Sequence, residues 1–132
     1  MKSKISLAFE KCKNEKRPAL ITYTVAGDNT KNNSLKILNT ISKYADILEL
    51  GFPHNTPVAD GGQIQESSHR ALKNGIKLKD VFKIVKKFKK KNLNKPIILM
   101  GYFNLIYQTG ENNFLKSCKS AGVDGLIVVD LP

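Results

Sequence analysis

The stretch LELGFPHNTPVADGGQIQ, residues 48–65, decides how the chain is organised, because a short apolar run ends inside it and an irregular segment follows. Glu49 lies near the end of the apolar run, which is typical of a β-strand, and Asp60 lies in the segment after it. The prolines and glycines of that segment interrupt regular structure and predict a loop. The stretch therefore offers two carboxylates, from different backbone elements, that could face one cavity.

Each of these carboxylates also has an ordinary structural interpretation. Glu49 could be a solvated acid at a strand end, and spacing alone favours neither this interpretation nor a catalytic one. Asp60 directly precedes two glycines and a predicted helix, so a turn or capping role is the stronger local interpretation for it. Both alternatives stay open on the spacing of these residues.

Apolar runs and helical periodicity alternate along the rest of the chain. β-branched and aromatic runs predict strands at 19–25, 46–50, 97–100 and 125–129. Amphipathic spacing predicts helices at 3–13, 34–44, 64–73, 78–91 and 114–121. Asn33 or Ser34 is available to cap the second helix. Strands that are almost wholly apolar and alternate with helices indicate an α/β fold with a helix-covered parallel sheet and right-handed crossovers.

Alternation along each predicted strand assigns every second residue to one face of the sheet. That face would carry Ile21, Tyr23, Ile47, Glu49, Ile98, Met100, Ile127 and Val129. Glu49 would be the one charge on an apolar wall, where desolvation would raise its pKa toward the range useful for acid/base catalysis. If this face is a barrel interior, Glu49 lies at the mouth where (βα)8 enzymes place their sites.

Length and composition predict a single globular domain, since the chain has 132 residues of which 41% are hydrophobic. The net charge of +11 is compatible with nucleic acid, an anionic surface or a phosphorylated metabolite as partner. The lysines of the predicted helix 78–91 lie beside apolar residues at helical spacing, so we interpret them as its solvated face rather than a nucleic-acid patch. These lysines are Lys83, Lys86, Lys87, Lys89, Lys90 and Lys91.

The cysteines and histidines suggest no redox or metal chemistry. Cys12 and Cys118 are far apart and outside any Cys-x-x-Cys motif, so we expect reduced structural thiols. His54 and His69 have no companion at ligand spacing and are expected at the surface. No apolar run approaches the ~20 residues that span a bilayer, which predicts a soluble, cytoplasmic protein without membrane contact.

Several motifs along the chain match one known family in order and spacing. They are AGD at 26–28, ADILELG at 45–51, ELGFP at 49–53, PVADG at 57–61, MGYFN at 100–104, AGVDGLIV at 121–128 and DLP at 130–132. Through them the chain resembles, from Phe9 to Pro132, the N-terminal half of the tryptophan synthase alpha subunit. The resemblance implies a (βα)8 TIM barrel with an extra N-terminal helix. Residues 1–132 would supply that helix and the first four βα units, as one incomplete domain.

The resemblance also implies a reaction in tryptophan biosynthesis. This reaction is the retro-aldol cleavage of indole-3-glycerol phosphate to indole and glyceraldehyde 3-phosphate, by a carbon–carbon lyase that needs no cofactor in this subunit. Glu49 matches the family's acid/base, and Asp60 matches the acid that binds the indole N–H and stabilises positive charge on the ring. The positions that line the apolar indole pocket match Tyr23, Met100, Ile127 and Val129.

A protein partner is implied as well, namely a beta subunit that uses pyridoxal phosphate to join indole to serine in an alpha2beta2 complex. The loops after the second and third strands dock onto it in the family. In this chain those loops contain Pro53, Pro57, Tyr102 and Asn104. The chain reads His54-Asn55-Thr56 where the family usually has Phe-Ser-Asp, so the acid of a possible intersubunit salt bridge is missing.

Other functions remain open on the sequence. A half barrel without the later phosphate loops could be catalytically incomplete and only bind a beta-subunit partner. A different barrel acting on a phosphorylated metabolite is disfavoured by the paired ELG and ADG motifs. Nucleic-acid binding is the least favoured, because no binding motif accompanies the lysines.

Overall fold

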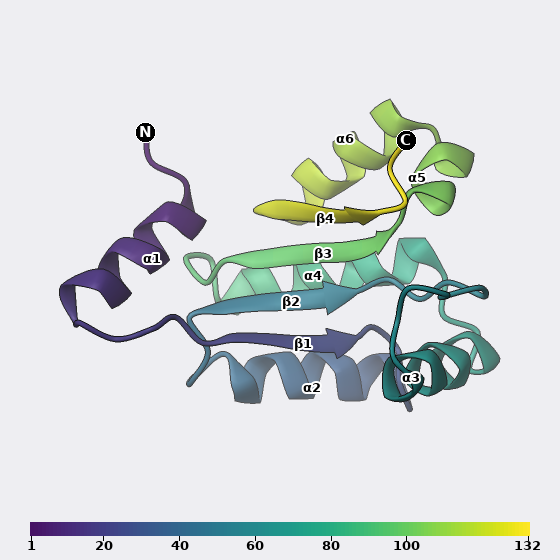
Figure 1. Ribbon diagram of the computed structural model, residues 1–132, viewed down its shortest axis with the longest axis horizontal. Helices are drawn as coiled ribbons and strands as arrows, with labels where there is room; N and C mark the ends of the chain where they lie inside the picture. Colours follow the sequence, from purple (N-terminus) through teal and green to yellow (C-terminus); the bar gives the residue numbers. More distant parts are fainter.

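The computed structural model describes residues 1–132 and contains one sheet of four parallel strands in the order β1-β2-β3-β4. The strands are β1 (Ile21–Val25), β2 (Ile47–Gly51), β3 (Ile97–Tyr102) and β4 (Gly125–Val129). The helices are α1 (Lys4–Asn14), α2 (Lys31–Ile41), α3 (Gly62–Lys73), α4 (Leu78–Lys91), α5 (Phe103–Thr109) and α6 (Glu111–Ala121). Figure 1 shows the strands running side by side in the same direction. The predicted alternation of strands and helices is confirmed, and no helix is both long and apolar enough to cross a membrane.

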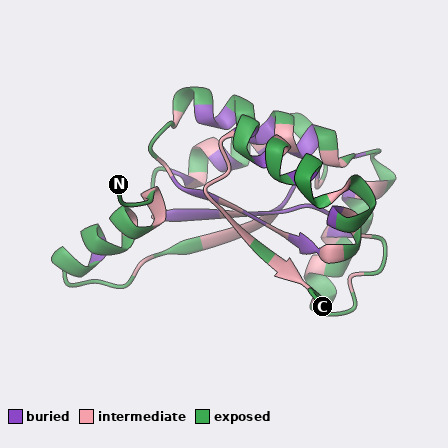
Figure 2. Ribbon diagram, turned by 90° about the horizontal axis from the view of Figure 1, so that it is seen from above, coloured by how far each residue is buried: buried purple, intermediate pink, exposed green.

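Helices α2, α4 and α6 cover one face of the sheet, as the view in Figure 2 shows. Leu48, Leu50 and Leu99 point into this layer and are fully buried. They pack against helix residues such as Phe88 and Phe114, which are also fully buried. Burial of these large side chains supplies the main hydrophobic stabilisation of the fold.

The opposite face of the sheet is the one predicted to carry Glu49. Strand register pairs Glu49 with Tyr23 on β1 and with Ile98 on β3, while Met100 pairs with Ile127 on β4. Aligned residues of neighbouring parallel strands point to the same side, so the predicted composition of this face is confirmed. Ile127 is 43% exposed, whereas the helix-covered face is buried.

Helix α1 lies near the amino ends of the strands rather than over the helical layer (Figure 1). Ile5 from this helix lies so close to Gly125, the first residue of β4, that a side chain at Gly125 would collide with it. After the helix, Arg17 donates two hydrogen bonds of 2.8 Å to Asp46, just before β2. The expected extra N-terminal helix is therefore present and attached to the rest of the chain.

Helix α2 begins earlier than predicted, and the predicted caps are wrong. Thr30 is the N-cap, and its hydroxyl accepts a hydrogen bond of 3.0 Å from the Asn33 amide. Ser34 lies inside the helix instead, where its hydroxyl accepts a hydrogen bond of 2.7 Å from the Gly27 amide. The polar residues 31–33 hide this first turn from a periodicity argument, because they add no apolar face.

Helix α5 was not predicted, since residues 102–104 were expected in a loop after the third strand. Tyr102 in fact ends β3, and Asn104 lies in α5. The helix is only seven residues long and ends at Gly110, whose φ of +84° starts the turn into α6. A helix of about two turns is too short for a period to be recognised, and it depends on its packing against β3 and α6.

Lys89 corrects the prediction that all lysines of α4 are solvated. Its side chain lies four residues after Val85 on the buried stripe of the helix, and Lys89 is only 5% exposed. Its ammonium donates hydrogen bonds of 2.5 Å to Asp124 and 2.7 Å to the Lys95 carbonyl. Asp124 also accepts a hydrogen bond of 2.9 Å from the Ile97 amide, so this ion pair joins α4 to the starts of β3 and β4. The other five lysines of this predicted face are exposed, as expected.

We expect Asp124→Ala to lower the free energy of unfolding by about 3–5 kcal/mol, because it leaves the buried Lys89 charge without its partner. Asp124→Asn should cost less, since the amide oxygen can still accept from the Ile97 amide. Urea unfolding followed by circular dichroism measures both variants. Lys90→Ala on the exposed side of α4 is the control, with an expected change within about 0.5 kcal/mol. An Asp124→Ala variant as stable as this control would contradict the structural role of the pair.

Candidate active site

Glu49 projects from the middle of β2 onto the apolar face of the sheet. Its side chain is half-buried between the Tyr23 and Ile98 positions of the neighbouring strands. The ion pairs of the chain engage other acids, and none engages Glu49 or Asp60. Burial raises the pKa of the Glu49 carboxyl above its ordinary value, in the direction expected from the sequence. An unpaired carboxyl of this kind is suited to exchanging protons with a ligand.

Tyr23 links the surroundings of the two carboxylates. Its phenol reaches over Gly51 at the end of β2, where the hydroxyl occupies the space that a Cβ would need. Burial raises the pKa of the Tyr23 phenol, and the nearby negative charges of Asp60 and Glu49 raise it further. Both carboxylates are therefore close enough to act on one phenol. The structure brings Glu49 and Asp60 to the same end of the sheet, as the opening stretch of sequence suggested.

Asp60 lies in the loop of residues 52–61, which connects β2 to α3. Its amide donates a hydrogen bond of 3.0 Å to the Pro57 carbonyl, and its carbonyl accepts one of 2.9 Å from the Gln65 side chain. The N-cap of α3 is Gly61, with no side-chain cap, so the capping interpretation of Asp60 is wrong. The backbone of Asp60 closes a turn, while its carboxylate makes no ion pair and lies near the Tyr102 hydroxyl.

The residues expected to line a substrate pocket lie on the same face as Glu49. Met100 and Ile127 are register partners on β3 and β4, and Val129 is paired with Tyr102 one step further along. They form an apolar surface beside the carboxylates, together with the Tyr23 ring. That this surface binds a substrate stays a prediction.

The residues expected at a partner interface differ in their exposure. Asn104 is exposed and Pro57 is half-buried, whereas Pro53 and Tyr102 are buried. Tyr102 lies beneath the loop of residues 52–61, since its hydroxyl accepts a hydrogen bond of 3.0 Å from the Ala59 amide. Of the four, Asn104 and Pro57 are thus the residues that present surface at this end of the sheet. Their contact with a partner stays a prediction.

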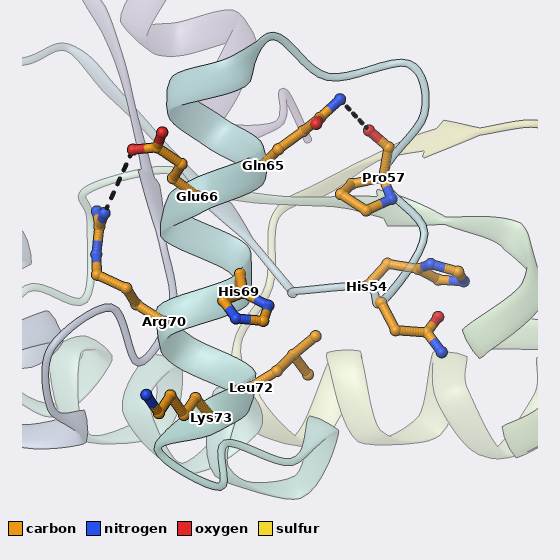
Figure 3. Close-up of a pocket in the computed structure, with 9 residues that line it drawn as sticks. His54, Pro57, Gln65, Glu66, His69, Arg70, Leu72 and Lys73 are labelled. Atoms are coloured by element: carbon orange, nitrogen blue, oxygen red, sulfur yellow. Dashed lines mark hydrogen bonds and ion pairs between the residues drawn. The ribbon is translucent and has the colours of Figure 1, made fainter.

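A broad hollow lies beside this site rather than in it. It has a volume of about 910 Å³ and is formed by the loop and one side of α3. Figure 3 shows His54 and Pro57 facing His69 across it, with Gln65 hydrogen-bonded to the Pro57 carbonyl. Neither Glu49 nor Asp60 lines this hollow, so its size does not make it the reaction site. We place the candidate site at the unpaired carboxylates because they carry the chemistry.

His54 is the functional-loop residue that the sequence left unassigned. It was expected at the surface, but it is half-buried and its ring lies 5.0 Å from that of Tyr102. His69 is exposed, as expected. The contact partners His54 and Tyr102 are distant in sequence, so no local pattern could have indicated their contact.

The raised pKa of Glu49 predicts how stability responds to pH. The folded protein holds the Glu49 proton more tightly than the unfolded chain, so this group's contribution is complete below the unfolded pKa and is lost as pH rises through the folded pKa. Glu49→Gln, which cannot ionise, is therefore expected to be more stable than wild type at about pH 7 and to lose this advantage near pH 4. Urea unfolding at the two pH values measures the difference.

Glu111→Gln is the matched control for this experiment. Glu111 is an exposed acid in the first turn of α6, where a negative charge is favourable, so its neutralisation should be neutral or destabilising at pH 7. If Glu49→Gln changed the free energy of unfolding as the control does at both pH values, the buried, unpaired state of Glu49 would be contradicted.

Comparison with known proteins places this chain in a family. The chain is 72% identical over 130 residues to the tryptophan synthase alpha chain of Pelagibacter ubique, covering 98% of this chain and 49% of that protein. It is 51% identical over 114 residues to the corresponding chain of Pyrococcus furiosus, covering 86% of this chain and 46% of that one. The chain thus spans about half the length of the curated relatives it matches.

Solved structures agree with these sequence relatives. The crystal structure of tryptophan synthase subunit alpha from Legionella pneumophila matches with a TM-score of 0.96 at 38% identity, covering 100% of this chain and 51% of that one. The four βα units therefore correspond to half of a TIM barrel, as expected from the sequence. The family model described as tryptophan synthase alpha chain matches residues 9–132. The chain belongs to the tryptophan synthase alpha chain family.

Proposed function

We propose that this chain carries the two catalytic carboxylates of the tryptophan synthase alpha reaction, a step of tryptophan biosynthesis. The reaction is the retro-aldol cleavage of indole-3-glycerol phosphate to indole and glyceraldehyde 3-phosphate. One observation carries the proposal. Glu49 is half-buried and unpaired on an apolar sheet face, with a raised pKa, and shares the surroundings of Tyr23 with Asp60.

Glu49 is proposed as the acid/base of the cleavage. The indole C3 atom must gain a proton, and the hydroxyl on the side-chain carbon attached to C3 must lose one. The bond between C3 and that carbon then breaks. A carboxyl whose pKa is raised toward neutrality is better matched to both transfers than an ordinary glutamate. The apolar surface of Met100 and Ile127 beside it would receive the indole ring, consistent with the match to the family's pocket positions.

Asp60 is proposed to stabilise the ring during the same step. Protonation at C3 places positive charge on the indole nitrogen, and a carboxylate that accepts the N–H hydrogen bond offsets this charge. Such a carboxylate must not be engaged elsewhere, and Asp60 has no ion-pair partner in the structure. The two acids thus have separate roles, and the proposed reaction requires no cofactor in this chain.

Substitutions test these roles in a full-length alpha chain that carries this segment. Glu49→Gln should lower kcat for indole release from indole-3-glycerol phosphate by about 10²–10⁴-fold, because the proton transfers lose their group. Asp60→Asn should lower kcat by roughly 10²-fold, because it removes the charge opposite the ring. Glu10→Gln, on helix α1 near the amino ends of the strands, is the control and should leave kcat unchanged. Near-wild-type turnover by Glu49→Gln would refute the assignment.

The proposed partner is a tryptophan synthase beta subunit, the pyridoxal-phosphate enzyme that consumes indole. Its docking surface is proposed at the loop of residues 52–61 and at α5. Val58 and Tyr107 support this placement, since both are large apolar residues at least 70% exposed near the candidate site. Asn104 is also exposed and lies on α5, the helix that carries Tyr107.

A binding titration tests the partner and its docking surface. In the full-length alpha chain, Asn104→Arg should weaken binding of the beta subunit by about tenfold or more, since a buried charge without a partner is costly at an interface. Tyr44→Arg is the control, because Tyr44 is exposed before the amino end of β2 and away from the proposed surface. Calorimetry measures both dissociation constants. Equal affinities for the two variants would contradict the proposed surface.

A further inference from the structure

The side chain of Tyr102 contacts the loop of residues 52–61 from the side of the sheet. Tyr102 is the last residue of β3 and is only 4% exposed. Its hydroxyl oxygen accepts a hydrogen bond of 3.0 Å from the Ala59 amide, across a separation of 43 residues in the chain. Ala59 directly precedes Asp60, so this bond fixes the backbone next to the carboxylate proposed to bind the indole ring.

The ring of Tyr102 also holds the other end of the same loop. The His54 imidazole lies 5.0 Å from the Tyr102 ring between centroids, with an angle of 40° between the planes. This distance is within the range of favourable aromatic contacts. The Nδ1 atom of His54 accepts a hydrogen bond of 2.8 Å from the Thr56 amide, which orients the imidazole on the ring. A single side chain of the sheet therefore contacts the loop at both ends.

The remaining polar contacts of the loop act within it or with α3. The Asp60 amide bonds to the Pro57 carbonyl, and the Gln65 side chain bonds to the carbonyls of both residues. These bonds set the internal shape of the turn and its relation to α3. Of the side-chain hydrogen bonds in the structure, that of Tyr102 alone joins residues 53–61 to the sheet that carries Glu49.

Tyr102 is well suited to define a position, because it belongs to a rigid element. β3 is paired on both sides, and Tyr102 itself is the register partner of Val129 on β4. Burial raises the pKa of the Tyr102 phenol, the Ala59 hydrogen bond opposes this rise, and the nearby carboxylates of Asp60 and Asp130 add to it, so the pKa stays above its ordinary value and the hydroxyl is neutral. The phenol can therefore keep its own proton while it accepts the Ala59 hydrogen bond.

We propose that Tyr102 is a positioning residue that places Asp60 over the sheet face at Glu49 through its hydrogen bond to the Ala59 amide. The inference rests on the proposed function, since it assigns Tyr102 an effect on the carboxylate that binds the ring. Asp60 acts on charge that develops during the reaction, so a misplaced Asp60 lowers kcat more than it raises KM.

A double-mutant cycle in the full-length alpha chain tests this role. Tyr102→Phe keeps the ring against His54 and removes the hydroxyl that accepts from the Ala59 amide and lies by the Asp60 carboxylate. It should lower kcat for indole release by about fivefold to tenfold, the equivalent of one hydrogen bond. In an Asp60→Asn background the same substitution should change kcat by less than about twofold, because the group that it positions is already inactive. Equal losses in the two backgrounds would overturn the proposal.

Hydrogen exchange gives a readout that does not depend on the reaction. The Ala59 amide should exchange faster in Tyr102→Phe than in wild type, while amides in the core of β3 should be unchanged. Tyr44→Phe, at an exposed tyrosine before the amino end of β2, is the matched control and should alter neither Ala59 exchange nor kcat. Unchanged Ala59 exchange in Tyr102→Phe would overturn the positioning role even if kcat fell.

The two proposals fail in different ways. A wild-type full-length chain that releases no indole from indole-3-glycerol phosphate would overturn the proposed function and the positioning role with it. A wild-type chain that is active, with Tyr102→Phe losing activity independently of Asp60, would overturn the positioning role alone.

Discussion

The parallel register of the four strands is the constraint on which the rest of the structure depends. Parallel strands bring their carboxyl ends to one edge, and in-register pairing sends Tyr23, Glu49 and Ile98 to one face. The helices bury the other face, so a charge on this one can be half-buried without lying in the core. The perturbed carboxyl of Glu49 is thus a consequence of sheet geometry. Its surroundings come from strands that are separated along the chain.

Much of this geometry was predictable because it depends on short-range periodicity. Apolar runs identified the four strands, and alternation assigned Glu49 to the correct face before any partner strand was known. The failures occurred where long-range contacts override local patterns. Lys89 belongs to a run of solvated lysines in the sequence. Its side chain nevertheless lies on the buried face of α4 and pairs with Asp124, which is 35 residues further along the chain. The short helix α5 likewise has no period of its own to detect.

The candidate site shows the same division between local and long-range information. The location and the raised pKa of Glu49 followed from its place in a strand. Asp60 could be a turn residue as easily as a ligand on local spacing, and its backbone does close a turn. What distinguishes it is a carboxylate without an ion-pair partner near Tyr23 and Tyr102, and these two tyrosines belong to other strands. Such a distinction requires the fold, because the loop sequence alone specifies only its own turns.

The loop that carries Asp60 is attached to the sheet through His54 and Ala59, which both contact Tyr102. Where the resembling family usually has phenylalanine, this chain has His54, which still presents a planar ring to Tyr102. The imidazole also accepts a hydrogen bond from the Thr56 amide, which a phenyl ring cannot do. Thr56 in turn stands where the resemblance implies an acid, and its hydroxyl donates a hydrogen bond of 3.0 Å to the Asn55 side chain. Glu49 is held by a strand paired on both sides, whereas Asp60 depends on these few contacts. A change of loop sequence therefore acts mainly on Asp60 and on the proposed partner surface, and leaves the acid/base in place.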